Sequence, residues 1–196
     1  MDKEKIYVDA DDVILNTSEV IIEFLNNIYN INPSKSINDL KDWKYKSIYR
    51  DTDMSLVEKY WETDEFFDKV KINKDFLNFY NDTKDIYEWI IFTQGSKTNL
   101  QKKKEYFQQY LPNVEMIGID CSESKNQFDL RDGIQIDDNY KNLLSNAYFK
   151  ILIKNFHETD YNQVLENHTN LYIVNEWNEI KDILNFYNKI NVEDLM

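Results

Sequence analysis

The chain has 196 residues, which suits one globular domain with room for a modest insertion. Its 42% hydrophobic residues can build a core, yet no run approaches the roughly 18 apolar residues that a membrane span requires. The formal net charge of -13 disfavours a nucleic acid polymer as partner, because such binding rests on lysine and arginine contacts to phosphates. The N-terminus lacks the basic and apolar layout of a signal peptide, so we expect a cytoplasmic protein.

The first predicted element is a short buried strand over residues 6–9, which runs directly into a group of acids. Asp9, Asp11 and Asp12 lie within four positions of one another. An aspartate at the end of a strand is often only a turn residue, so these acids alone do not identify a site. The residues that follow, 18–29, place apolar side chains on one face and predict an amphipathic helix.

Residues 17–72 are predicted to form a small helical cap that is inserted after the first strand. The interval before the next strand is too long for a simple crossover, and it carries helix signals such as the capping-box pattern at residues 36–39. It is also dense in aromatic residues, among them Trp43. The predicted division is therefore a core domain of residues 1–16 and 73–196 with the cap between these two parts.

A second buried strand is predicted over residues 89–93, followed by a helix over residues 97–110. The strand ends in the sequence Thr-Gln-Gly-Ser, which places a hydroxyl group, that of Thr93, at the strand end and also suits a helix N-cap. On the helix, we interpret the run Lys102 to Lys104 as a face exposed to solvent.

Three further strands and a final helix complete the predicted elements. The strands cover residues 134–137, 149–153 and 171–174, and the helix covers residues 176–187. Strands that alternate with helices predict an α/β fold with a parallel sheet and helices on both faces. The first of these three strands ends in Asp137 and Asp138, and Lys125 precedes it.

Ligands of an open α/β sheet bind beyond the carboxyl ends of its strands, where these polar residues are expected to meet. Each has an ordinary alternative, because aspartates favour turns and a lone lysine is usually a surface residue. Carboxylates gathered at one place repel one another unless a cation lies among them. Carboxylate oxygens are also the ligands that Mg²⁺ prefers, and Mg²⁺ commonly bridges to phosphate. The combination therefore predicts a magnesium site that handles a small phosphorylated substrate.

Taken in order, VDADDV, IIFTQGS, Lys125 and IQIDDN resemble the four motifs of the haloacid dehalogenase (HAD) superfamily of phosphohydrolases. This resemblance implies a Rossmann-like core domain and hydrolysis through an aspartyl-phosphate. It implies that Asp9 is the nucleophile and that Asp11 is the general acid and base. The phosphate ligands it suggests are Thr93, Gln94, Lys125 and Lys97.

The same resemblance implies that Asp9, Asp138 and the backbone carbonyl of Asp11 bind Mg²⁺. Asp137 would assist directly or through water, and the sequence leaves open which of the paired aspartates is the direct ligand.

Within the superfamily, the layout resembles the 5'(3')-deoxyribonucleotidases and their bacterial and phage relatives. Val13, the size of the cap, the stretch EFFDKVKINKDF and Trp177 at the start of the last helix carry this likeness. Thr17 stands where mammalian-type members tend to place an aromatic residue against the base. Thr17 is accordingly one predicted substrate contact. Trp43 is the other, because an aromatic residue of the cap could stack on a nucleobase, although the cap's aromatic residues could also simply form its own core.

The sequence thus predicts a magnesium-dependent phosphomonoester hydrolase that dephosphorylates (deoxy)nucleoside monophosphates. Two alternatives stay open: a HAD phosphatase for another small phosphate, such as a sugar phosphate, and a catalytically silent HAD-like binding protein. The preference for base, sugar and 5' or 3' phosphate stays open, as does the formation of a homodimer. His157 and His168 lie in late polar stretches, where we expect surface or loop roles.

Overall fold

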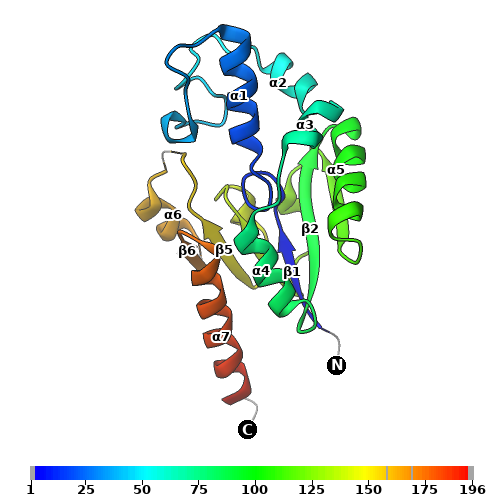
Figure 1. Ribbon diagram of the computed structural model, residues 1–196. Helices are drawn as coiled ribbons and strands as arrows, with labels where there is room; N and C mark the ends of the chain where they lie inside the picture. The colour runs from blue at the N-terminus through cyan, green and yellow to red at the C-terminus, as the bar shows by residue number, and fades with distance from the viewer. Residues whose placement is uncertain (1–2, 158, 169, 194–196) are drawn as a thin grey trace.

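Six parallel strands form the centre of the molecule, in the order β3-β2-β1-β4-β5-β6 (Figure 1). The computed structural model describes residues 3–157, 159–168 and 170–193. The strands are β1 (Glu4–Val8), β2 (Tyr87–Gly95), β3 (Glu115–Asp120), β4 (Gly133–Asp137), β5 (Phe149–Ile153) and β6 (Leu171–Val174). The predicted α/β class with a parallel sheet is confirmed.

Both faces of the sheet bury apolar side chains, because neighbouring residues of a strand point to opposite sides. On β1, Ile6 and Val8 belong to the larger hydrophobic cluster, whereas Tyr7 belongs to a smaller one on the other face. On β2, Ile91 and Phe92 divide between the same two clusters. Both faces of such a sheet must be covered by other elements.

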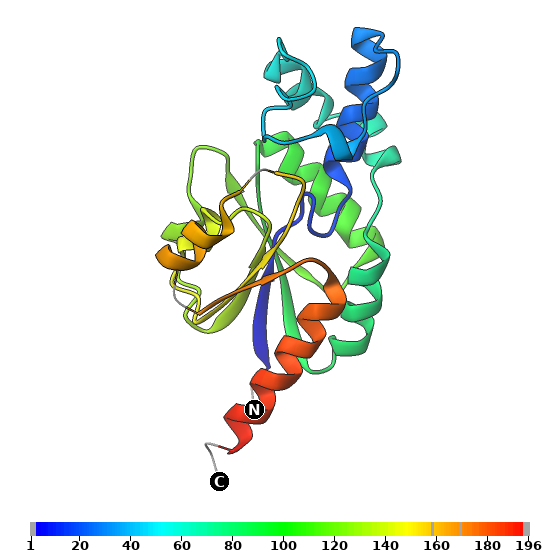
Figure 2. The same cartoon turned by 90° about the vertical axis from the view of Figure 1, so that its left-hand side faces the viewer.

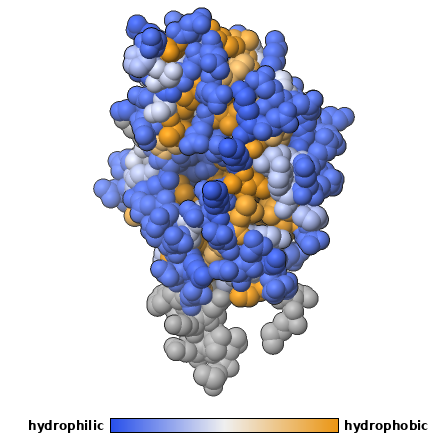
Figure 3. Space-filling view, viewed as in Figure 1, coloured by the Kyte–Doolittle hydropathy of each residue, from blue (hydrophilic) through white to orange (hydrophobic). Residues whose placement is uncertain are grey.

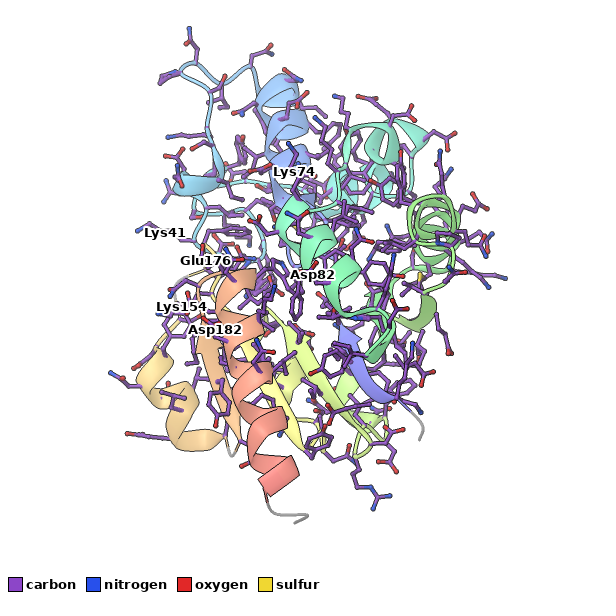
Figure 4. The ribbon with its side chains drawn as sticks, turned by 60° about the horizontal axis from the view of Figure 1, so that its bottom comes forward. Lys41, Lys74, Asp82, Lys154, Glu176 and Asp182 are labelled. Atoms are coloured by element: carbon purple, nitrogen blue, oxygen red, sulfur yellow. The ribbon has the colours of Figure 1, made fainter. Side chains whose placement is uncertain are left out.

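Helices cover the two faces unequally (Figure 2). The larger cluster takes side chains from α4 (Lys74–Thr83), α5 (Lys97–Tyr110) and α7 (Trp177–Glu193). The other face carries η2 (Lys125–Gln127), η3 (Asn142–Leu144), α6 (Tyr161–Asn167) and the loops beside them. Figure 4 shows α4 and α7 side by side, and an ion pair between Lys181 and Asp82 joins them at 2.9 Å.

The surface seen in Figure 3 is mainly hydrophilic, and its hydrophobic residues show chiefly in patches that run down the middle of the view. Within the ranges that the structure describes, no helix is both long enough and apolar enough to cross a membrane.

Every predicted element has an observed counterpart, but strand β3 and helices α4 and α6 were not predicted. The helix predicted over residues 97–110 begins and ends where α5 does. Strand β3 is missed, because it lies at the edge of the sheet and exposes Glu115, Gly118 and Asp120. Its sequence therefore lacks the apolar run that identifies the inner strands.

Residues 17–72, here named the cap segment, lie beyond the carboxyl ends of β1 and β2 (Figure 1). The cap segment contains α1 (Thr17–Tyr29), η1 (Ile37–Asp39), α2 (Met54–Tyr60) and α3 (Asp64–Lys69). The chain leaving β1 runs beside the chain returning to α4: Asn16 N–H donates to the Lys71 carbonyl at 3.2 Å and Asn73 N–H to the Ile14 carbonyl at 2.7 Å. This junction suits the predicted division into cap and core, which stays a prediction.

Two sides of the cap segment contact the rest of the protein. On one side, α5 receives four polar contacts, which pair Ser96 with Glu62, Asn99 with Trp61, Lys102 with Asp64, and Tyr106 with Val70. On the other side, the Trp43 ring stacks on the His157 ring with their centroids 3.4 Å apart. His157 lies in a loop, as expected, but it is buried rather than at the surface.

Candidate active site

Two neighbouring strands bring three carboxylates together at the carboxyl edge of the sheet. Asp9 follows β1 and extends its ladder by donating its backbone N–H to the Ile136 carbonyl at 2.9 Å. Asp137 ends β4, and Asp138 follows it. One oxygen from each of the carboxylates of Asp9, Asp137 and Asp138 lies within 4.8 Å of the other two. Three hard oxygen donors at this spacing fit the coordination chemistry of Mg²⁺.

Lys125 joins two of these carboxylates. Its ammonium donates to Asp9 Oδ1 at 2.6 Å and to Asp137 Oδ2 at 2.7 Å, and the residue is only 2% exposed. Burial lowers the pKa of Lys125, but the charges of Asp137 and Asp9 outweigh burial and raise it, so the ammonium stays protonated. An ammonium has three N–H donors. Two of them donate to these carboxylates, and the described residues offer the third no hydrogen-bond acceptor.

The three carboxylates carry more negative charge than Lys125 neutralises. Burial raises the pKa of Asp9 to about 7, with Lys125 opposing the shift and Asp137 adding to it. Burial and the charge of Asp137 likewise hold the pKa of Asp138 well above its usual value. Amide groups donate to two of the acids, from Asn155 to Asp138 Oδ2 at 2.6 Å and from Asn142 to Asp137 Oδ1 at 3.1 Å. A divalent cation would relieve the remaining repulsion.

Asp11 is held by hydrogen bonds on both of its carboxylate oxygens. The Thr17 hydroxyl donates to Oδ1 at 2.7 Å, and the Lys103 ammonium donates to Oδ2 at 2.5 Å. Each carboxylate oxygen has a second lone pair, so Asp11 can still carry a proton or meet another donor. Its side chain is 21% exposed and therefore reaches solvent or a ligand.

Lys103 is the residue that the sequence analysis misplaced, since the run of three lysines on α5 is not a solvated face throughout. Lys103 is fully buried, and its ammonium also donates to the Thr93 hydroxyl at 2.9 Å and to the Gln94 carbonyl at 3.0 Å. A sequence signal for this existed. Lys103 lies three residues after Leu100 and four before Phe107, on the apolar stripe of the helix.

Asp12 connects the active-site loop to the cap segment. It adopts a left-handed backbone conformation with φ of 57°, which aspartate tolerates better than most residues. Its carboxylate accepts the Ser18 backbone N–H at 2.7 Å and the Ser18 hydroxyl at 2.5 Å, and Ser18 also hydrogen-bonds the Tyr45 hydroxyl at 3.1 Å. Burial raises the pKa of Asp12 to about 7, although the hydrogen bonds from Ser18 lower it.

The carboxylates of Asp9, Asp137 and Asp138 are here named the acidic group. Four of the predicted contacts lie outside this group or face away from it. The Gln94 amide donates to the Glu123 carbonyl at 2.6 Å, and Thr17 is fully buried with its hydroxyl on Asp11. Lys97 is exposed and, among the described residues, its ammonium forms no hydrogen bond with the acids. Trp43 is 45% exposed and carries His157 on one face. Substrate contact by any of these four stays a prediction.

A parallel sheet whose strand ends bring paired acids, a buried lysine and a threonine hydroxyl together defines a hydrolase with the HAD-like fold. Solved structures agree on the fold. A HAD-like family hydrolase from Streptococcus pneumoniae superposes with a TM-score of 0.63 at 13% identity, covering 93% of this chain and 98% of its own. A HAD-hydrolase from Bacillus subtilis, bound to magnesium, gives 0.59 at 11% identity, covering 94% and 100%.

The family described as 5' nucleotidase, deoxy (pyrimidine), cytosolic type C protein matches residues 3–190. This span includes every residue of the acidic group, the two buried lysines Lys103 and Lys125, and the cap segment. The chain belongs to this family. The comparison with curated proteins finds no match.

Proposed function

We propose that the protein hydrolyses nucleoside monophosphates, with Mg²⁺ as its cofactor and an aspartyl-phosphate on Asp9 as the intermediate. The observation that carries the proposal is the position of Lys125, which joins Asp9 to Asp137 beside Asp138 and keeps one N–H donor free. A cation of this kind balances a nucleophilic carboxylate and binds the phosphate that the carboxylate attacks. A protein that only bound phosphate would gain nothing from a buried carboxylate facing the bound anion.

The first step forms a bond between Asp9 and the phosphorus and breaks the bond from phosphorus to the nucleoside oxygen. Lys125 occupies Oδ1 of Asp9, so Oδ2 is the oxygen positioned to attack. Asp11 gives its proton to the departing oxygen. In the second step, Asp11 takes a proton from water, the water oxygen attacks the phosphorus, and inorganic phosphate leaves Asp9 as a free carboxylate.

Charge on the phosphate oxygens is met by the third N–H of Lys125 and by a bound cation. Asp9, Asp138 and the Asp11 carbonyl would hold Mg²⁺, with Asp137 beside them, and the ion would neutralise phosphate charge when bound. Because the hydrolysis of phosphate monoesters is extremely slow without a catalyst, positioning and charge stabilisation must account for most of the acceleration.

The family description favours deoxynucleoside 5'-monophosphates with pyrimidine bases as substrates. Trp43 supports a planar ligand, because it is half exposed and, among the described residues, only the His157 ring stacks on it. A base stacked on the other face of Trp43 would lie between the cap segment and the core.

The test is phosphate release with Mg²⁺ and with EDTA, from deoxy- and ribonucleoside 5'- and 3'-monophosphates, sugar phosphates and 4-nitrophenyl phosphate. We expect Mg²⁺-dependent release that is fastest from pyrimidine deoxynucleoside 5'-monophosphates. The Asp9→Asn protein, folded by circular dichroism, is the control and should release no phosphate. Release from sugar phosphates alone would identify a sugar phosphate, and not a nucleotide, as the substrate. Turnover by Asp9→Asn would rule out the aspartyl-phosphate intermediate.

A further inference from the structure

Lys103 has no role among the expected residues, yet it lies at the centre of the site. Its side chain is fully buried, and it reaches from the middle of α5 to the carboxyl end of β2. A buried ammonium is costly unless it is paired and hydrogen-bonded. Methionine or leucine would fill the same space without that cost, so packing alone does not account for a lysine at this position.

The three hydrogen bonds of Lys103 use all of its donors within the protein. Its ammonium donates to Asp11 Oδ2 at 2.5 Å, to the Thr93 hydroxyl at 2.9 Å and to the Gln94 carbonyl at 3.0 Å. Since an ammonium has three N–H groups, none is left for a phosphate. Lys125 differs in this respect, because it keeps one donor free. The two buried lysines therefore serve different purposes.

The contacts of Lys103 fix the orientation of one carboxylate. Asp11 follows β1 on a loop, so its side chain depends on hydrogen bonds from other elements for its orientation. Lys103 holds Oδ2 against the end of β2, and Thr17 holds Oδ1 from the first residue of α1. A carboxyl group fixed in this way can meet the leaving oxygen without reorganising, and a general acid must lie within hydrogen-bond reach of the atom that it protonates.

We propose that Lys103 is a positioning residue that holds Asp11 in the orientation needed to protonate the leaving group. This role rests on the proposed function, in which Asp11 is the general acid. The proton moves from Asp11 to the nucleoside oxygen as the bond from phosphorus to that oxygen breaks and the bond from phosphorus to Asp9 forms. Lys103 itself exchanges no proton and touches no substrate.

The test compares two esters that differ in their need for an acid. A nucleoside alkoxide must be protonated as it leaves, whereas nitrophenolate leaves without a proton. In Lys103→Met, kcat/KM should fall roughly 100-fold for a nucleoside monophosphate and by less than about 5-fold for 4-nitrophenyl phosphate. The quantity kcat/KM is used because it reports the step in which the leaving group departs, before the water attack common to both esters.

Lys104→Met is the matched control. Lys104 is the exposed neighbour of Lys103 on the same helix, and its substitution removes the same charge. It should leave both values of kcat/KM unchanged. A variant that is partly unfolded lowers both values equally, so the ratio between the two esters reports positioning independently of folding.

An equal loss for both esters in Lys103→Met would overturn the proposal and indicate a phosphate contact or a structural role. No loss for either ester would also overturn it. Wild-type protein that hydrolyses neither ester would overturn the proposed function, and this role of Lys103 would fall with it.

Discussion

His157 lies in the loop after β5, with its imidazole ring stacked on the exposed indole of Trp43. The histidine is buried, and among the described residues neither of its ring nitrogens has a hydrogen-bond partner. Burial lowers the pKa of His157 to about 4, and the charge of Asp42 only partly opposes this shift. Protonation of the ring would place a charge in the contact that joins the cap segment to the loop beside Asp138.

This shift predicts a pH dependence of stability. The usual pKa of histidine is about 6.5, so between about pH 4 and 6.5 the unfolded chain binds a proton at this residue that the folded protein does not. The free energy of unfolding should therefore be fully retained above pH 6.5 and should fall as the pH drops toward 4. His157→Phe keeps a ring against Trp43 and removes the proton site.

The measurement is urea unfolding of the wild type and His157→Phe in EDTA from pH 4.5 to 7.5. We expect the wild type to lose on the order of 1–2 kcal/mol relative to His157→Phe at the acid end. The buried carboxylates titrate in both proteins, so their contribution cancels in the difference. Parallel stability curves would show that the imidazole does not titrate differently in the two states.

At the level of single residues, sequence reasoning located the charges that come from strand ends and missed those that come from helix faces. Asp9 and Asp137 meet because β1 and β4 are neighbours in the sheet, and Lys125 reaches both from η2, in the segment before β4. Lys103 depends on the rotation of α5 about its axis, and a run of three lysines conceals a single inward-facing one. The amides of Asn142 and Asn155 left no signal at all.

Helix α5 is the element that the cap segment and the active site share. One side of it contacts the cap segment through Asn99 and Tyr106, which are seven residues apart and so lie on one face, and its N-cap residue Ser96 adds a third contact. The same helix sends Lys103 to Asp11. A shift of α5 relative to β2 would therefore move the acid and the cap segment together.

The contact between Asn99 and Trp61 is the best place to measure how strongly α5 holds the cap segment. The Asn99 amide donates to the Trp61 carbonyl at 2.9 Å, and Asn99 is 4% exposed. Asn99→Ala leaves a carbonyl without its donor, so the free energy of unfolding should fall by about 1–3 kcal/mol. Urea unfolding measures the change.

Lys102→Met is the comparison variant, because Lys102 pairs with Asp64, which is 90% exposed. An exposed ion pair contributes little, so this variant should lose less than about 1 kcal/mol. Equal losses in the two variants would mean that burial does not set the strength of these contacts.

Among the strands, those with an apolar run in the sequence could be predicted, including β6 at one edge of the sheet, whereas β3 at the other edge could not. β1, β2, β4 and β5 are buried strands with nearly continuous apolar runs. β3 pairs with β2 only and exposes half of its side chains to solvent, so its sequence has no continuous apolar run. The contacts between α5 and the cap segment join residues more than 30 positions apart, and nothing local in the sequence specifies them.

The whole molecule carries a net charge of -13 and a mainly hydrophilic surface (Figure 3), and it concentrates three acids at the end of its sheet. Without a cation, the folded state must bear the repulsion among these acids, whereas the unfolded chain separates them. A ligand that binds only the folded state stabilises it by mass action. Metal binding should therefore raise the Tm of the protein, and this can be measured before any substrate is known.

We expect millimolar Mg²⁺ to raise the Tm of the wild type by several degrees over the value in EDTA. Asp138→Asn replaces one of the three carboxylates with an uncharged amide, a weaker ligand for Mg²⁺, and should reduce this shift to less than half. Asp129→Asn, which changes an exposed acid away from the site, should keep the full shift. If Asp138→Asn responded to Mg²⁺ as the wild type does, the ion would bind elsewhere.

The junction between residues 14–16 and 71–73 has a consequence for chain connectivity. Because Asn16 and Lys71 hydrogen-bond each other, the two ends of the cap segment are held close together where they join the core. The entropic penalty of forming a loop grows only slowly with its length, so the segment between fixed ends can lengthen, shorten or be exchanged with little strain on the strands. Selectivity for the organic part of a substrate can thus diverge while the strand-end chemistry stays unaltered.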